Sequence, residues 1–274
     1  MKYSIDNLVI EITRKCNIKC RHCLRGPARN INITQEMMNK IVSQFDYINS
    51  ITFGGGEPSL FPEAIEWFIE AVQMYNVTVG NFYVVTNGKK YSQKLYDACY
   101  RLYNLCNENE ISGFCISDDE FHRECIPDRI KWEYNKIRYA AYPYYLTDYR
   151  YDENMTEEIY YDTISEYDYL PYFQENGHVH KDGDFYGIIK MGNAEKNGIW
   201  HRTLNIFYPK INEDFIDLDG SVRIEEEELY ITCNGDIFPN CDLSYALMDK
   251  GYYKLGNIDD FDAVIKELQK YQDC

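Results

Sequence analysis

Three cysteines lie close together near the start of the sequence, at Cys16, Cys20 and Cys23. Three thiolates at this spacing can wrap around one metal centre. A structural zinc ion usually takes four protein ligands, whereas three ligands leave one coordination position open. Soft thiolates suit iron–sulfur clusters, and a cubic cluster held by three cysteines leaves one iron able to bind a further group. The spacing therefore favours an iron–sulfur centre with an open position.

Alternating strand-like and helical segments must position these cysteines. Strands are expected at residues 7–13, 48–53, 81–85 and 111–116, and helices at 34–45, 62–75 and 91–107. Parallel neighbouring strands need crossover connections, and this alternation supplies them. The pattern predicts an α/β fold with a parallel sheet, closed as a barrel or as part of one.

Each of the four predicted strands is followed by residues that can do chemistry. These segments are Cys16–Cys23, Gly54-Gly55-Gly56-Glu57-Pro58, Thr86-Asn87-Gly88, and Ser117-Asp118-Asp119 with Phe121-His122. In parallel barrels the C-terminal ends of the strands meet on one face. We therefore expect the four segments to converge.

Together these motifs resemble the radical S-adenosylmethionine (radical SAM) superfamily. The CxxxCxxC spacing, the GGEP-like glycine run, the TNG turn and the SxD…H segment occur in the family's order over roughly residues 7–125. His22 departs mildly from the family, where an aromatic residue often precedes the last cysteine. The resemblance implies a partial (β/α)6 TIM-like barrel, here followed by a small C-terminal extension of one β-hairpin and one helix.

The resemblance also implies a mechanism. Cys16, Cys20 and Cys23 would hold a 4Fe–4S cluster, and S-adenosyl-L-methionine (AdoMet) would chelate its fourth iron. One electron would cleave AdoMet to methionine and a 5′-deoxyadenosyl radical, which abstracts hydrogen from a substrate C–H bond.

Further site residues follow from the same resemblance. The glycines bring backbone close to the cofactor, Glu57 accepts from its ammonium group, and the TNG turn shapes its pocket. The candidate cofactor-binding residues are Gly55, Gly56, Glu57, Thr86, Asn87, Ser117, Asp119 and Gly192, the last from a segment similar to the family's Gly-x-Ala. His122 is the candidate catalytic residue, with a purely structural role as the alternative.

The sequence divides into a barrel at residues 1–215 and an extension at 216–274. Within the barrel, residues 139–180 form an insertion rich in tyrosine and acidic residues, read as a surface insertion or a substrate-covering lid. Strand-like segments at 222–232 and 237–239 flank Asn-Gly, which predicts a hairpin, and a final helix is expected at 261–271.

The extension resembles part of a SPASM or twitch domain, which binds auxiliary iron–sulfur clusters in other radical SAM proteins. Cys233, Cys241 and Cys274 are the candidate ligands of one auxiliary cluster. The alternative is that they are buried or incidental thiols.

Charge and composition exclude some functions. The formal net charge of −17 argues against non-specific binding of nucleic acid, which needs positive charge. The sequence contains no run of about 18 apolar residues, so no membrane span is expected. No signal-peptide pattern precedes the first predicted strand, and a cytoplasmic protein is therefore expected. Residues 14–29 hold six basic residues and no acid, which suggests docking of an acidic electron donor similar to flavodoxin or ferredoxin.

Several functions remain open at this stage. The leading hypothesis is hydrogen abstraction from a peptide, as in the maturation of ribosomal peptides. The same chemistry on a sugar, nucleoside or other metabolite is an alternative, as is activation of a glycyl-radical enzyme. A non-catalytic zinc-binding interaction protein is the alternative from another class.

Overall fold

The computed structural model describes residues 2–89, 92–108, 112–116, 120–125, 188–200, 203–212 and 222–272. Its strands are β1 (Tyr3–Thr13), β2 (Phe45–Gly55), β3 (Thr78–Thr86), β4 (Gly113–Ile116), β5 (Lys210–Asn212), β6 (Val222–Ile231), β7 (Asp236–Phe238) and β8 (Gly256–Asn257). Its α-helices are α1 (Gln35–Val42), α2 (Glu63–Tyr75), α3 (Gln93–Tyr103), α4 (Glu120–Cys125), α9 (Gly192–Asn197), α10 (Tyr245–Asp249) and α11 (Phe261–Gln269). The predicted insertion at 139–180 and residues Ser117, Asp119 and Cys274 lie outside these ranges.

One mixed sheet organises the molecule. Its strand order is β4-β3-β2-β1-β6-β7-β8, with β5 paired to β6. The first four strands and β6 run parallel, whereas β5, β7 and β8 pair antiparallel. Within the described ranges β4 and β8 remain edges, so the sheet is open and rich in parallel strands. This agrees with the expected partial barrel.

The strand β1 is longer than the sequence pattern indicated, because it is paired on both edges. It lies between β2 and β6 and is buried along most of its length. The predicted hairpin is confirmed by β6 and β7. The sequence did not predict that β6 would pair with β1, since the pairing joins distant segments.

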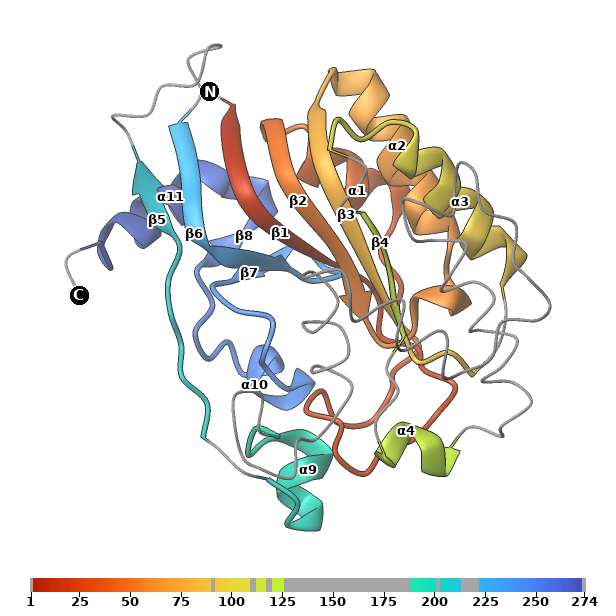
Figure 1. The fold of residues 1–274 in the computed structure, drawn as a ribbon. Coiled ribbons are helices and arrows are strands. Elements are labelled where there is room, and N and C mark those ends of the chain that lie inside the picture. The colour runs from red at the N-terminus through yellow and green to blue at the C-terminus, as the bar shows by residue number, and fades with distance from the viewer. Residues whose placement is uncertain are drawn as a thin grey trace, which may run out of the picture.

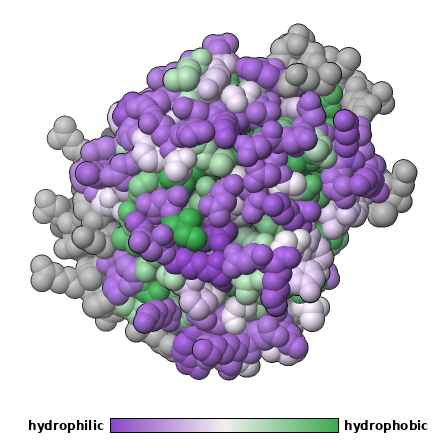
Figure 2. Space-filling view, turned by 180° about the vertical axis from the view of Figure 1, so that it is seen from behind, coloured by the Kyte–Doolittle hydropathy of each residue, from purple (hydrophilic) through white to green (hydrophobic). Residues whose placement is uncertain are grey.

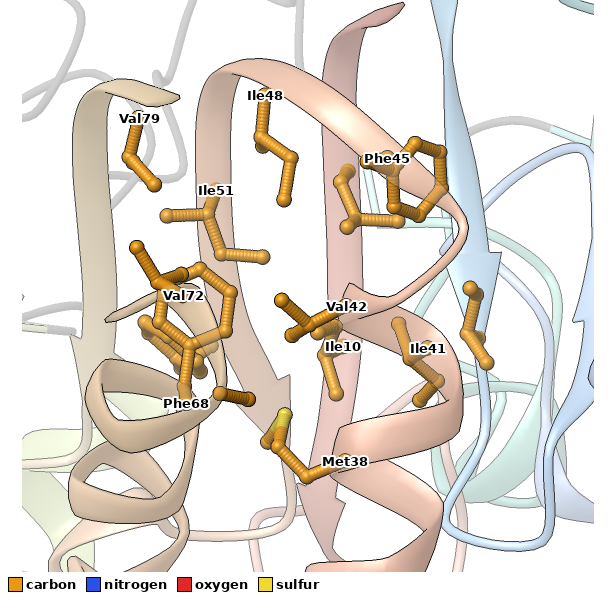
Figure 3. Packing of buried hydrophobic residues seen from close by; sticks show 14 of the residues in the cluster. Ile10, Met38, Ile41, Val42, Phe45, Ile48, Ile51, Phe68, Val72 and Val79 are labelled. Atoms are coloured by element: carbon orange, nitrogen blue, oxygen red, sulfur yellow. The ribbon is translucent and has the colours of Figure 1, made fainter. Parts of the chain in front are cut away.

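Helices cover one face of this sheet (Figure 1). The helix α1 begins where expected, because the Thr34 hydroxyl accepts a 3.1 Å hydrogen bond from the Met37 amide and so caps its N-terminus. Side chains from α1, α2 and the strands interdigitate in the core (Figure 3), where the labelled residues are Ile10, Met38, Ile41, Val42, Phe45, Ile48, Ile51, Phe68, Val72 and Val79. This packing fixes the strand ends from which the site is built.

A second, smaller core cluster joins the C-terminal residues to the sheet. It contains Val9, Tyr230, Phe238 and Tyr245, among others. The surface seen from behind is mostly hydrophilic, with small hydrophobic areas (Figure 2). None of the described helices is long and apolar enough to cross a membrane.

Candidate cofactor site

The segment after β1, residues 14–32, is called the cysteine loop here. Its base is closed by backbone hydrogen bonds from the Arg14 amide to the Ile31 carbonyl and from the Arg29 amide to the Arg14 carbonyl, each 2.8 Å. Cys20 is buried within it, while Cys16 and Cys23 are half-buried. Burial is the main cause that raises the pKa of the Cys16 thiol.

The glycine run after β2 packs directly against the cysteine loop. The Gly56 amide donates to the Thr13 carbonyl and the Glu57 amide to the Lys15 carbonyl, both at 2.7 Å. A Cβ atom on Gly56 would lie 2.0 Å from the Lys15 carbonyl oxygen. The absence of side chains here is therefore required by close backbone contact with the loop.

Glu57 joins this turn to the end of β3. Its carboxylate is buried and accepts hydrogen bonds from the Thr86 hydroxyl at 2.6 Å, the Asn87 amide at 2.7 Å and the Ser59 amide at 3.0 Å. A carboxylate has about four acceptor positions, so three of these are already used. The main contacts of Glu57 are thus with the protein.

Asn87 contacts both Glu57 and a cysteine of the loop. Its side-chain nitrogen lies 3.7 Å from the Cys16 sulfur and 2.9 Å from the Asn17 side-chain oxygen. The ammonium group of Lys89 also donates to the Asn17 carbonyl. The expected convergence is confirmed for the segments that follow β1, β2 and β3.

The helix α9 supports the loop from another side. The Asn193 amide donates to the Cys23 carbonyl at 2.9 Å, and its side chain donates to the Cys20 carbonyl at 3.1 Å. A Cβ atom on Gly192, which has φ +56°, would lie 2.2 Å from the Leu24 carbonyl oxygen. Gly192 therefore lies against the loop that holds the cysteines.

The helix α4 also packs against the cysteine loop. The ring of His22 stacks on Phe121 with centroids 4.7 Å apart, and meets His122 edge-on at 5.0 Å. Figure 1 shows the loop between α9 and α4. His122 is thus beside the cysteine loop, as the motif order predicted.

Sequence patterns did not reveal the buried charge network behind the loop. The Glu11 carboxylate accepts hydrogen bonds from Arg14 Nε at 2.6 Å, from the Tyr230 hydroxyl at 2.6 Å and from the Cys233 amide at 3.2 Å. Glu11 is fully buried, and Arg14 is 3% exposed. A lone acid inside an apolar strand was the available signal, because a buried charge needs partners.

The basic residues of the loop do not form one exposed island, contrary to the simplest interpretation of the sequence. Arg14 and Arg29 both reach Asp249, at 3.3 and 2.6 Å. Arg25 donates to the Leu243 carbonyl at 2.7 Å, and its guanidinium lies over the Tyr230 ring. Three of the six charges are therefore used to hold the C-terminal residues, while Lys19 and Arg21 are exposed.

The C-terminal cysteines lie in different surroundings. Cys233 belongs to the large core cluster, and its sulfur lies 3.1 Å from the Glu11 carbonyl oxygen. Cys241 packs against the smaller cluster. Burial raises the pKa of both thiols.

The donor set of the cysteine loop fits an iron–sulfur cluster. Three thiols come from one loop, and each would bind a different iron, so they need not meet at one point. Tyr245, 1% exposed, lies against this loop through the hydrogen bond of its amide to the Arg25 carbonyl, and its buried hydroxyl has no partner. Buried polar groups almost always have a hydrogen-bond partner, so a hydroxyl without one among the described residues leaves a donor that a bound group can satisfy.

Comparison with known proteins agrees with this geometry. The family model described as the radical SAM superfamily matches residues 10–130. None of the curated proteins compared matches the chain.

One solved structure shares the fold, and two more are similar at lower TM-scores. Hexahistidine-tagged anSMEcpe with bound AdoMet is similar with a TM-score of 0.50 at 14% identity, over 97% of this chain and 82% of that one. Native anSMEcpe with bound AdoMet and a peptide gives 0.47 at 15% identity, over 98% and 82%. SuiB of Streptococcus suis gives 0.46 at 12% identity, over 94% of this chain and 64% of SuiB.

Proposed function

We propose that Cys16, Cys20 and Cys23 hold a 4Fe–4S cluster, because the radical SAM family model matches residues 10–130 and enzymes of that superfamily use such a cluster with AdoMet. When bound, the cluster and AdoMet supply a 5′-deoxyadenosyl radical that abstracts hydrogen from substrate. The observation that carries this assignment is the 3.7 Å contact between the Asn87 side chain and the Cys16 sulfur. It brings the end of β3 to the cysteines, where AdoMet would lie.

The residues of the three turns then have distinct tasks. Glu57 orients Thr86 and the Asn87 backbone, because both donate to its carboxylate. Thr86, Asn87 and the backbone at Gly55 and Gly56 line the AdoMet site. The remaining candidates are Gly192, at the start of α9, with Ser117 and Asp119, which lie outside the described residues.

We further propose a peptide as substrate, with residues 216–274 acting as a twitch- or SPASM-like extension of a barrel at 1–215. The support is the hairpin of β6 and β7, which matches the pattern of such extensions. The proposed substrate surface is the face of β2 and β3 opposite α1–α3, where, among the described residues, Thr52 and Tyr83 are half-buried and Val85 is 42% exposed.

The proposal includes a cellular compartment and an electron donor. The eight cysteines whose side chains are described are free thiols, which supports a reducing cytoplasm. A flavodoxin- or ferredoxin-like protein would deliver the electron near Lys19 and Arg21, which are exposed on the cysteine loop.

Iron and sulfide analysis tests the cluster. After anaerobic reconstitution, the wild-type chain should hold about four irons per chain, and the triple variant with Cys16, Cys20 and Cys23 changed to Ala should hold none. Cys99→Ala, a buried cysteine on α3, is the control and should keep the iron. Zinc without sulfide in the reconstituted wild type would overturn the proposal.

The same count decides the auxiliary cluster proposed at Cys233, Cys241 and Cys274. About eight irons that fall to about four in the triple variant would support it. The present contacts of Cys233 and Cys241 favour the lower count, because their sulfurs lie in separate core clusters.

Deuterium transfer tests the substrate. Perdeuterated peptides should stimulate AdoMet cleavage and transfer deuterium to 5′-deoxyadenosine. Deuterated sugars and nucleosides are the matched comparison, and transfer from one of these alone would show that the peptide assignment is wrong.

A further inference from the structure

Three side chains that can bind a metal ion lie close together at the cysteine loop. The Cys20 sulfur and one imidazole nitrogen each from His22 and His122 lie within 4.8 Å of one another. This set differs from the three cysteines of the proposed cluster, because it replaces Cys16 and Cys23 with two histidines. One thiolate with two imidazoles is a donor set that zinc accepts.

The two histidines are held in place by packing. His22 stacks on Phe121, and Phe121 is only 7% exposed. His122 follows Phe121 on α4 and meets His22 edge-on. The three donors come from two segments that are far apart in sequence, so the folded chain brings them together before any metal binds. This lowers the cost of ordering the ligands.

We propose that Cys20, His22 and His122 form a zinc site in the cluster-free chain. Zinc binds thiolate sulfur at about 2.3 Å and imidazole nitrogen at about 2.0 Å, and water would complete a tetrahedron. The Cys20 thiol loses its proton when it binds the ion, which makes the affinity fall at low pH.

This site and the cluster exclude each other, a consequence that rests on the proposed function. Cys20 is the one ligand that both need, and a single thiolate cannot complete both centres. Zinc does not need Cys16 or Cys23, and the cluster does not need His22 or His122. Zinc bound here therefore blocks cluster assembly, and the assembled cluster removes the zinc site.

Metal titration of the full-length, cluster-free chain tests the site. Zinc is titrated against a chromophoric chelator, and Co²⁺ reports thiolate ligation through its sulfur-to-metal charge-transfer absorption. We expect about one zinc per chain, and a loss of about tenfold or more in affinity for His122→Ala. Cys20→Ala should lose the charge-transfer band. Cys16→Ala, the matched control on the same loop, should keep both the affinity and the band.

Cluster assembly gives the reciprocal test. His122→Ala should keep about four irons after reconstitution, whereas Cys16→Ala should lose them. Zinc added before reconstitution should slow cluster assembly in the wild type and not in His122→Ala. His122→Gln is the second variant, and its circular dichroism spectrum together with that of His122→Ala shows whether the fold is kept.

Two outcomes would overturn the zinc site. If Cys16→Ala weakens zinc binding as much as His122→Ala does, the ion lies among the cysteines. If neither His122 variant changes the affinity, zinc binds elsewhere. Both outcomes leave the iron content of the wild type unchanged, so they are distinct from failure of the proposed function.

Discussion

The hydroxyl of Tyr230 donates a 2.6 Å hydrogen bond to the buried carboxylate of Glu11, which joins β6 of the C-terminal hairpin to β1. The same carboxylate binds Arg14, the first residue of the cysteine loop. Arg14 in turn reaches Asp249 on α10. The C-terminal residues therefore help to fix the start of the loop that carries the cysteines.

Tyr230→Phe should destabilise the chain, because it leaves a buried carboxylate with one donor fewer. The expected loss is about 1.5–3 kcal/mol in the free energy of unfolding. Tyr245→Phe is the matched control, since the Tyr245 hydroxyl is buried without a partner among the described residues. It should leave stability equal or raise it by about 1 kcal/mol. Urea unfolding of the cluster-free chain measures both, and an equal loss in the two variants would contradict the role of Glu11.

Gly192→Ala should displace the cysteine loop. A Cβ atom there would meet the Leu24 and Cys23 carbonyl oxygens at 2.2 and 2.7 Å, and both belong to backbone. We expect iron content after reconstitution to fall to less than about half. Gly198→Ala at the opposite end of α9 is the control, because φ is +68° there but nothing lies within 4 Å. It should cost about 1 kcal/mol and keep the iron. Equal iron in both variants would show that the contact is unimportant.

Glu57→Gln should weaken the hydrogen bonding between the turns that follow β2 and β3. One carboxylate oxygen becomes an NH₂ group, which cannot accept a hydrogen bond. Thr86 and Ser59 donate to Oε1 and Asn87 donates to Oε2, so at least one of these bonds is lost. The expected loss is about 1–3 kcal/mol in unfolding free energy, with faster loss of iron on chelation. Glu63→Gln is the control, because the Glu63 side chain is 48% exposed and its ion pair with Lys94 is long, at 3.5 Å. That change should stay within about 0.5 kcal/mol.

Stability should fall in alkaline solution because of buried thiols. Burial raises the pKa of Cys106 to about 12, and burial also raises that of Cys99. An unfolded thiol has a pKa of about 8.5, so the folded chain keeps protons that the unfolded chain releases above that pH. The stabilisation is complete below about pH 8.5 and is lost as the pH rises towards 12, by up to about 1.4 kcal/mol per pH unit for each thiol.

Unfolding measured between about pH 9 and 11 tests this slope. Cys106→Ala should make it shallower. Val264→Ala, which also truncates a buried side chain, should lower stability and leave the slope unchanged. A slope that Cys106→Ala does not alter would assign the effect to other groups.

Reversing the exposed charges of the cysteine loop should weaken reduction by an acidic donor. Lys19→Glu with Arg21→Glu should raise the apparent KM for flavodoxin by about tenfold at low salt, and added salt should shrink the difference. Lys266→Glu on α11 changes the net charge away from the loop and is the control. If both variants show the same KM, the donor does not dock at this loop.

Local patterns predicted much of this molecule. The spacing of apolar residues along the sequence predicted β1–β3, α1–α3 and the final helix to within a few residues. The reason is that residues facing the core recur with the side-chain period of a strand or of a helix. The predicted strands were shorter than the strands in the structure. Tyr3 to Asp6 and Thr78 to Gly80 form strands through pairing with neighbours, and such pairing leaves little trace in the local sequence.

The sequence by itself determined the chemistry, since Cys16, Cys20 and Cys23 are close along the chain and their spacing alone defines a three-thiolate loop. Only the tertiary structure decided what holds that loop. Glu11 meets Tyr230, and His22 meets His122, because β6 pairs with β1 and α4 packs on the loop. Contacts between such distant segments depend on how the elements pack, which no local spacing encodes.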